Sequence, residues 1–296
     1  MKKILRSILR VILRLYPIER GKYTILTKYY FPYLLPSKGT RKISTLKYNI
    51  KMDLDLNEYL QSYLYFFGSY ELPTLKLIKR LLKPSDMILD IGANVGYTSL
   101  TFAKFINDKG KIFSFEPEKK NYNTFLKNIK LNKFNNIYPH KLAVADENKS
   151  IKLYLSKSEN DGIHSTLLHT DTLSENYEEV EAVKMDDFVK NNNITKVNFV
   201  KIDVEGAEID VINGMKQVMS DNQPVIILEL VESLQKLKNL TTSEFKKILF
   251  NEYNYYPFII SDKGFISKCD LDSKHESDNV VFIHKDKINF YNEIMV

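Results

Sequence analysis

An acid followed by two glycines stands where an apolar run of the sequence ends. Residues 87–96 read MILDIGANVG, so Asp90, Gly92 and Gly96 form the pattern D-x-G-x-x-x-G. A dinucleotide site uses G-x-G-x-x-G to bring backbone amides against phosphate, and an acid in that turn would oppose the phosphate charge. Asp90 suits a cationic ligand better. S-adenosyl-L-methionine (SAM) carries both a sulfonium and an ammonium group, so we predict a SAM site at this turn.

Two further acids extend the predicted cofactor site. Glu116 follows the apolar run 111–115 (KIFSF), and a carboxylate at the end of a second parallel strand accepts hydrogen bonds from both ribose hydroxyls. Asp146 follows a third run, 137–142, and the short segment Ala-Val-Ala. Apolar surface beside a polar edge at this point suits an adenine ring.

Another group of acids follows the apolar run 198–202. The segment DVEGAE (203–208) places Asp203, Glu205 and Glu208 close together, and Glu229 ends the run 225–228. In open α/β sheets, ligands bind outside the carboxyl ends of the parallel strands. We therefore expect these acids to lie beside the glycine turn.

The apolar runs alternate with helical patterns, which predicts an α/β fold with a mainly parallel sheet. We expect helices over 72–82, 97–105 and 119–131, and a later helix that begins near residue 245. The runs 256–260 and 280–284 predict two last strands joined by a polar connection.

Four segments resemble the FkbM-type SAM-dependent methyltransferases in order and spacing: DIGANVGYTSL (90–100), FEPEKKNY (115–122), VKIDVEGAE (200–208) and ILEL (227–230). The resemblance covers residues 65–285. It implies a Rossmann-like class I methyltransferase with a mainly parallel seven-stranded sheet and an antiparallel last strand. The residues at the start of the chain add an N-terminal helical extension to this fold. The resemblance also implies O-methylation of sugars or secondary metabolites. From the resemblance we add Asn94, and Glu71 in the segment GSYE (68–71), to the cofactor-binding residues.

Methylation of an aliphatic alcohol needs a general base, or a metal ion that lowers the pKa of the hydroxyl. Asp203 or Glu205 would serve as the base. Asp203, Glu205 and Glu229 also offer the hard oxygen ligands that Mg²⁺ prefers, so a metal site is an alternative. For Glu208 we expect a structural role at the start of a helix near residue 207, because acids in a first helical turn accept bonds from free amides.

The acidic turn also bears on the methyl acceptor. Methyltransferases that act on the amines of adenine or cytosine typically carry an N-P-P-[YF]-like turn at this strand, so DVEGAE favours an oxygen acceptor on a sugar and disfavours nucleic acid. His164 lies in the polar segment NDGIHST (160–166), where the resemblance places a substrate loop. We take His164 as a third catalytic candidate.

Positive charge is concentrated at the start of the chain. Residues 1–51 hold thirteen lysines and arginines against one acid, while the rest of the chain holds 30 basic and 36 acidic side chains. The body is therefore not expected to carry a basic groove for nucleic acid. We predict a basic amphipathic extension or lid over 1–60 and a SAM-binding catalytic domain over 61–296.

Residues 2–16 have the pattern of a short basic amphipathic helix, with apolar residues on one side and Arg6, Arg10 and Arg14 on the other. Its longest apolar run, residues 11–13, is too short for a membrane span. We expect this helix to lie in the headgroup region of an anionic membrane, on the inner face, with docking on the domain or on a second copy as the alternative. One cysteine, Cys269, allows no disulfide within this sequence, which fits a cytoplasmic setting.

Two other function classes fit parts of the sequence. An NAD(P)-dependent reductase would need a phosphate-compatible turn and a Tyr-x-x-x-Lys pair, yet neither Tyr122 nor Tyr138 has a lysine four residues later. A non-catalytic interaction protein on this fold would not need Asp90, Glu116 and Asp203 together. We therefore expect an O-methyltransferase acting on a sugar or glycan hydroxyl, with a small secondary metabolite as the alternative acceptor.

Overall fold

The computed structural model describes residues 2–15, 21–156, 165–166, 173–274 and 278–296. These residues form two compact units. The first unit comprises the described part of residues 1–71 together with Ser156, and the second comprises residues 72–155 and the described residues from Ser165 onward. Each unit is described separately below.

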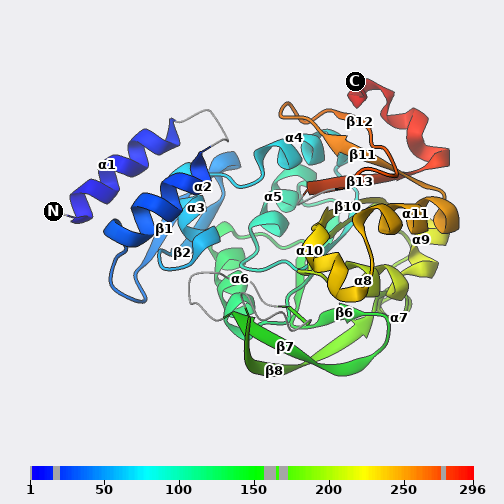
Figure 1. Cartoon of the computed structure of the whole chain (residues 1–296), viewed down its shortest axis with the longest axis horizontal. Coiled ribbons are helices and arrows are strands. Elements are labelled where there is room, and N and C mark those ends of the chain that lie inside the picture. Colours follow the sequence, from blue (N-terminus) through cyan, green and yellow to red (C-terminus); the bar gives the residue numbers. More distant parts are fainter. Residues whose placement is uncertain (1, 16–20, 157–164, 167–172, 275–277) are drawn as a thin grey trace. The chain divides into compact units, whose positions relative to one another are not determined.

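The second unit is built on a mixed eight-stranded sheet (Figure 1). Its strands are β3 (Met87–Ile91), β4 (Lys111–Phe115), β5 (Ile137–His140), β9 (Phe199–Ile202), β10 (Val225–Leu230), β11 (Tyr255–Ile260), β12 (Ile266–Lys268) and β13 (Asp278–His284). Their spatial order is β12-β11-β13-β10-β9-β3-β4-β5. From β10 to β5 the neighbours are parallel, and β13 is antiparallel to both β10 and β11. The predicted mainly parallel sheet with an antiparallel last strand is confirmed.

The sheet has one strand more than the seven predicted. β12 lies within the connection expected to be irregular, and it pairs antiparallel with β11. It is three residues long and only Ile266 is buried, so no alternation is visible in the sequence.

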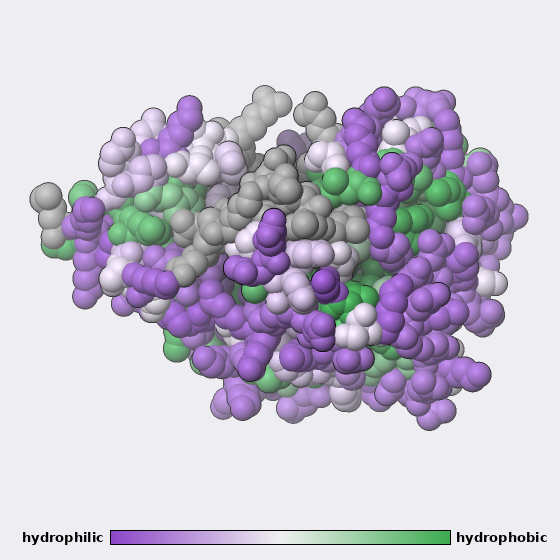
Figure 2. Space-filling model, turned by 60° about the horizontal axis from the view of Figure 1, so that its bottom comes forward, coloured by the Kyte–Doolittle hydropathy of each residue, from purple (hydrophilic) through white to green (hydrophobic). Residues whose placement is uncertain are grey.

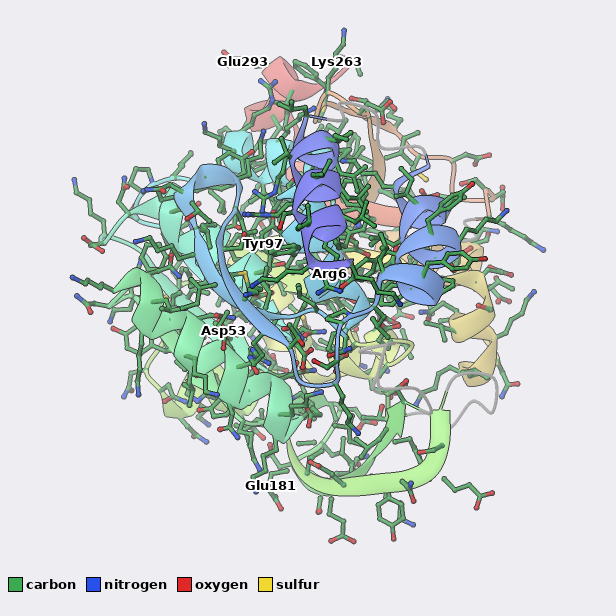
Figure 3. The ribbon with its side chains drawn as sticks, turned by 90° about the vertical axis from the view of Figure 1, so that its left-hand side faces the viewer. Arg6, Asp53, Tyr97, Glu181, Lys263 and Glu293 are labelled. Carbon is green, nitrogen blue, oxygen red and sulfur yellow. The ribbon has the colours of Figure 1, made fainter. Side chains whose placement is uncertain are left out.

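A second, three-stranded sheet has the order β6-β8-β7, with β6 (Ala143–Ala145), β7 (Lys149–Ser156) and β8 (Leu173–Lys184). The predicted strand 137–142 ends at His140 because the chain then leaves the large sheet for β6. β8 was not predicted. It is rich in glutamate, a residue depleted in strands, and one of these, Glu181, is labelled in Figure 3.

Helices flank the large sheet (Figure 1). They are α4 (Leu72–Leu81), α5 (Tyr97–Ile106), α6 (Lys119–Asn132), α7 (Met185–Asn191), α8 (Glu208–Gly214), α9 (Lys216–Asn222), α10 (Glu232–Gln235) and α11 (Thr242–Tyr253). The three predicted helices correspond to α4, α5 and α6 within one residue. α11 begins three residues earlier than predicted, because Thr241 and Glu244 form a capping box. Every residue of β9 is buried, as expected for a strand covered on both faces.

The first unit contains α1 (Lys2–Arg14), α2 (Lys22–Ile25), a π-helical segment (Leu26–Leu34), β1 (Arg41–Thr45), β2 (Lys51–Asp55) and α3 (Tyr59–Phe67). β1 and β2 form an antiparallel pair. Aromatic side chains fill its core, where the rings of Tyr30 and Phe66 meet edge to face at 4.6 Å. In the described parts of the chain, none of the helices combines the length and the apolar character needed to cross a bilayer.

Candidate active site

The glycine turn and the acidic turn meet where the strand order reverses. β3 and β9 are neighbours in the large sheet, with β4 and β5 on one side and β10 on the other. Such a switch point is where open α/β sheets bind ligands. The N–H of Asp203, just after β9, donates to the carbonyl of Ile91, the last residue of β3, at 3.0 Å. The two turns therefore lie side by side, as the sequence predicts.

The glycines are required by close approach as well as by backbone conformation. Gly92 has a φ of +85°, and a Cβ there would lie 1.8 Å from the carbonyl oxygen of Asp203. Gly96 has a φ of +89°, and a Cβ there would lie 1.9 Å from the ring of Phe125. Residues with a side chain rarely adopt such φ angles and would clash here. The spacing of the two glycines is thus set by contacts with Asp203, just after β9, and with α6.

Each backbone amide from Gly92 to Gly96 already has an acceptor. The N–H groups of Gly92 and Ala93 both donate to the carbonyl of Phe115 at 2.9 Å. The N–H of Asn94 donates to the Glu116 carboxylate at 2.8 Å. The last two donate within the turn itself. A turn that binds phosphate must offer free amides. This turn favours a cofactor that binds without a phosphate contact here.

Glu116 is buried at the end of β4 and both its oxygens are held. Oε2 accepts from the N–H of Asn94 at 2.8 Å, and Oε1 accepts from the N–H of Glu118 at 2.9 Å. Burial raises the pKa of Glu116 to about 8, although these two amide bonds favour the charged form. Each oxygen retains a lone pair, so the group fits a pair of ribose hydroxyls.

Asp90 belongs to a buried polar row across three strands. It lies opposite Ser114 of β4 and Lys201 of β9, and it accepts a hydrogen bond from the hydroxyl of Ser99 in α5. Burial raises the pKa of Asp90 to about 6, while the charge of Lys201 and the Ser99 bond act in the opposite direction. Asp90 is 1% exposed, so its carboxylate would not contact a cofactor directly. It can act on a bound cofactor through the electrostatic effect of its charge.

Lys201 was not among the predicted site residues. Its Nζ lies 2.8 Å from Oδ2 of Asp203, and the two side chains are 5% and 31% exposed, respectively. The buried ammonium thus pairs with Asp203 and also lowers the pKa of Asp90 against the effect of burial. The sequence did contain a signal for Lys201, since a lysine stands inside the apolar run 198–202. A lysine is almost never fully buried unless it is paired, so its position predicts a charged partner.

Glu205 occupies a strained position in the acidic turn. Its φ is +53°, a conformation that costs a non-glycine residue about 1–3 kcal/mol. Burial, and then the neighbouring carboxylates of Asp203, Glu229 and Glu208, raise the pKa of Glu205 well above its usual range. A carboxylate with a raised pKa is a stronger base than an ordinary one.

Glu208 holds the acidic turn together. Its Oε1 accepts from the N–H groups of Gly206 at 3.2 Å and Val204 at 3.4 Å, and its Oε2 accepts from Nε2 of Gln235 at 2.7 Å. The side chain is buried at the first residue of α8. These bonds support the structural role expected for Glu208.

The sequence profile of the family described as "Methyltransferase FkbM domain" matches residues 90–256, which is more than half of the chain and includes both turns. The chain belongs to the FkbM methyltransferase family. With the strand order above, this confirms the Rossmann-like class I methyltransferase fold and makes SAM the expected cofactor.

Three related proteins align with about half of this chain. They are Methyltransferase 1 of Beauveria bassiana (29% identity, 51% of this chain and 67% of the relative), Hexuronic acid methyltransferase AglP of Haloferax volcanii (24%, 53% and 61%) and 2-O-methyltransferase NoeI of Sinorhizobium fredii (25%, 49% and 63%). The alignments thus span 61% to 67% of the lengths of these relatives. A crystal structure of methyltransferase FkbM from Methylobacillus flagellatus aligns at 14% identity with a TM-score of 0.46, over 76% of this chain and 54% of that one.

The remaining predicted residues lie in different places. Asp146 follows β6, where its half-exposed carboxylate pairs with Nζ of Lys149 at 3.0 Å. Glu229, in β10, contributes charge to the environment of Glu205. Glu71 belongs to the first unit, and His164 falls outside the described residues. The cofactor role of Glu71 and the catalytic role of His164 stay predictions.

Ser165, the residue after His164, was also missed. It is buried, and its hydroxyl donates to the carbonyl of Glu205 at 2.7 Å. Its backbone pairs with Tyr154 of β7. The small polar segment around His164 was the available signal, and Ser165 helps to fix the backbone of the acidic turn.

A metal site is not evident at these carboxylates. In the ranges that the structure describes, no three His, Cys, Asp or Glu side chains are grouped so that they could hold a metal ion. Ligation by Asp203, Glu205 and Glu229 stays a prediction.

Proposed function

We propose that this member of the FkbM family is a SAM-dependent O-methyltransferase whose acceptor is a hydroxyl of a sugar or glycan. The observation that carries the proposal is the chemistry of the switch point. Carboxylates gather around the Lys201 ammonium, beside a glycine turn whose amides are all occupied.

This site suits a cofactor that is cationic and carries a ribose. The two carboxylates of Asp90 and Asp203 outnumber the one ammonium of Lys201, so a sulfonium and an ammonium group would be attracted. Glu116 provides two acceptor oxygens for ribose hydroxyls. A nicotinamide dinucleotide fits poorly, because its pyrophosphate would meet carboxylates and occupied amides.

Glu205 is our candidate for the general base. When bound, SAM supplies an electrophilic methyl group, whose transfer to oxygen leaves S-adenosylhomocysteine. Glu205 accepts the proton of the acceptor hydroxyl, and the burial and neighbouring carboxylates that raise its pKa make it a stronger base than an ordinary glutamate. Asp203 pairs with the Lys201 ammonium at 2.8 Å. It is the alternative base, and His164 is a third candidate.

The proposed acceptor class follows from the relatives and from the acidic turn. Two of the relatives are named for methylating a hexuronic acid and for 2-O-methylation. The carboxylates of the acidic turn suit removal of a hydroxyl proton. They do not provide the acceptor geometry expected for the exocyclic amine of a nucleobase.

We also propose a cytoplasmic setting with peripheral contact to an anionic membrane. Cys269 is the one cysteine of the sequence and forms no disulfide in the structure, which is compatible with a reducing compartment. The membrane contact involves the first unit and is developed in the next subsection.

The test is methyl transfer to soluble glycosides by the full chain. Methyl glycosides of glucuronic acid and glucose would be incubated with SAM, with the matching 2-deoxy compounds as acceptor controls. We expect S-adenosylhomocysteine and a methylated glycoside. Absence of SAM binding, or transfer to RNA and to no glycoside, would contradict the proposal.

A pair of matched variants separates the base from the fold. Glu205→Gln should reduce methyl transfer at least about a hundredfold, the usual minimum for a general base, with SAM affinity little changed. Glu181→Gln makes the same chemical change on the exposed side of β8 (Figure 3) and should keep full activity. Full activity in Glu205→Gln would move the role to Asp203 or His164.

A further inference from the structure

Helix α1 turns its arginines toward its own unit. Arg10 donates to the carbonyl of Tyr65 at 3.2 Å and to Oγ of Ser44 at 2.7 Å, and Arg14 donates to the same two groups. Arg6, labelled in Figure 3, donates to a backbone carbonyl of the same unit at 3.0 Å. The sequence suggested headgroup contacts for these arginines. The structure instead uses them to attach α1 to α3, β1 and the π-helical segment.

The opposite face of α1 is apolar and exposed. Ile4, Ile8, Val11, Ile12 and Leu15 are between 52% and 79% exposed. Their spacing places them along one side of the helix, and no charged residue falls on that side. We call these five residues the outer face. Figure 2 shows hydrophobic residues in green near its left-hand end.

The first unit also exposes tyrosines and lysines on its surface. Tyr23, Tyr29 and Tyr33 are each at least 60% exposed. Among the described residues up to Asn57, every exposed charged side chain is a lysine, while the acids Asp53 and Asp55 lie within reach of Arg41. Tyrosine is enriched where a membrane meets water, and lysine is attracted to anionic lipid.

We infer that the outer face of α1 docks on an anionic lipid bilayer, with the helix lying in the plane of the interface. The five side chains enter the boundary between headgroups and acyl chains, and the exposed lysines contact the lipid phosphates. Thirteen residues of helix are about 20 Å long, which suits a helix lying flat on the surface.

The charge of the first unit selects lipid over a second copy of the chain. Pairing two outer faces would bring together two surfaces whose exposed charges are all positive, and like charges oppose such an interface. An anionic bilayer removes this repulsion and also covers the apolar side chains. Burial of each isoleucine or valine changes partitioning by roughly tenfold.

The docking mode predicts a partial salt dependence. The positive charge of the first unit contributes an electrostatic term, so high salt should weaken the binding in part, while the apolar contribution persists. Binding that was electrostatic alone would be lost at high salt.

The test is cosedimentation of the full chain with vesicles of roughly three parts phosphatidylcholine to one part phosphatidylglycerol. Ile8→Glu combined with Val11→Glu should reduce the bound fraction at least tenfold. The control combines Leu237→Glu with Phe290→Glu, which adds the same charge at exposed apolar residues of the second unit, and it should bind like the wild type. Ile8→Ser with Val11→Ser removes the apolar surface without adding charge and should also weaken binding. Circular dichroism checks the fold of each variant.

Equal binding by the two Ile8/Val11 variants and the wild type would overturn the inference. So would a dimer, seen by analytical ultracentrifugation, that Ile8→Ser with Val11→Ser dissociates, because a second copy would then cover the outer face. SAM binding is measured on the same samples and should be unchanged, so failure of the membrane inference is distinguishable from failure of the proposed enzyme activity.

Discussion

The glycine turn and the acidic turn are held in the same way, but they present different groups at the switch point. In each turn a buried glutamate accepts backbone amides, Glu116 in the first case and Glu208 in the second. Each turn also has a non-glycine residue at positive φ, Asn94 at +51° and Glu205 at +53°.

The two turns differ in the free-energy cost of the positive φ at Asn94 and Glu205. Asparagine adopts left-handed φ angles readily, whereas glutamate does so at some strain. The glycine turn is therefore a low-strain platform whose polar groups are already paired. The acidic turn holds Glu205 in an unfavourable conformation among other carboxylates, as expected where reactivity takes precedence over stability.

The largest expected effect comes from breaking the contact between the turns. Gly92→Ala would place a Cβ against the Asp203 carbonyl, so we expect the free energy of unfolding to fall by about 3 kcal/mol or more, with loss of SAM binding. Chemical denaturation measures the first effect and calorimetry the second. Gly39→Ala is the control, since Gly39 has a φ of +76° and open space around it. It should cost only about 1 kcal/mol, and an equal loss in both variants would mean that the contact with Asp203 does not matter.

The second prediction separates strain from chemistry at Glu205. Glu205→Gly should relieve the positive φ, so stability should be unchanged or higher by up to about 1 kcal/mol, while methyl transfer falls at least about a hundredfold. Lys133→Gly relieves a similar φ of +58° at the end of α6 and should leave activity intact. A Glu205→Gly variant that is both less stable and fully active would remove the contrast between the turns.

The third prediction concerns the pH dependence that Glu116 imposes. Its pKa of about 8 lies above the ordinary 4.5, so the folded state without ligand holds the proton more tightly than the unfolded chain. This stabilisation is complete below the ordinary pKa and is lost as the pH rises through about 8. The Tm without ligand should therefore fall from about pH 6 to about pH 9, and fall less in Glu116→Gln.

Cofactor binding should show the opposite pH trend, because ribose hydroxyls are better held by the ionised carboxylate. SAM affinity should rise over the same pH window in the wild type. Glu116→Gln should bind about tenfold more weakly, without that rise, because one acceptor is replaced by a donor. A variant with wild-type affinity at both ends of the window would reject Glu116 as the ribose acceptor.

The smallest effect is expected at Asp146. Its carboxylate is 42% exposed and paired with Lys149, so a contact with the adenine edge would be a single solvated hydrogen bond. Asp146→Asn should change SAM affinity less than about fivefold, and Asp187→Asn, an acid bonded to Asn148 nearby, serves as the control. A loss of a hundredfold would place Asp146 among the main cofactor contacts.

The sequence predicted the residues that end parallel strands, because each of these strands is an apolar run that stops at an acid. Asp90, Glu116 and Asp203 could be placed at one edge of the sheet in this way, and the structure has them there. Lys201 could not be assigned, because its role depends on Asp90, which becomes its neighbour only when β3 and β9 pair in the folded sheet. The short strand β12 and the glutamate-rich β8 were missed because neither shows a clear alternation.

The orientation of α1 is another feature that could not be predicted from the sequence. Its two faces were evident from the spacing of the arginines, but which face the unit would bury was not. The outcome was decided by the carbonyl of Tyr65 and the hydroxyl of Ser44, which the guanidinium groups of Arg10 and Arg14 reach only in the folded unit.

The most direct test of the central claim is calorimetric titration of the full chain with SAM and, separately, with NADH. A carboxylate-rich switch point with an amide-saturated glycine turn predicts binding of SAM in the micromolar range and no measurable heat with NADH. Glu116→Gln should weaken the first titration and leave the second flat. Tight NADH binding with no SAM binding would contradict the account, because the same turn would then have to accept a pyrophosphate.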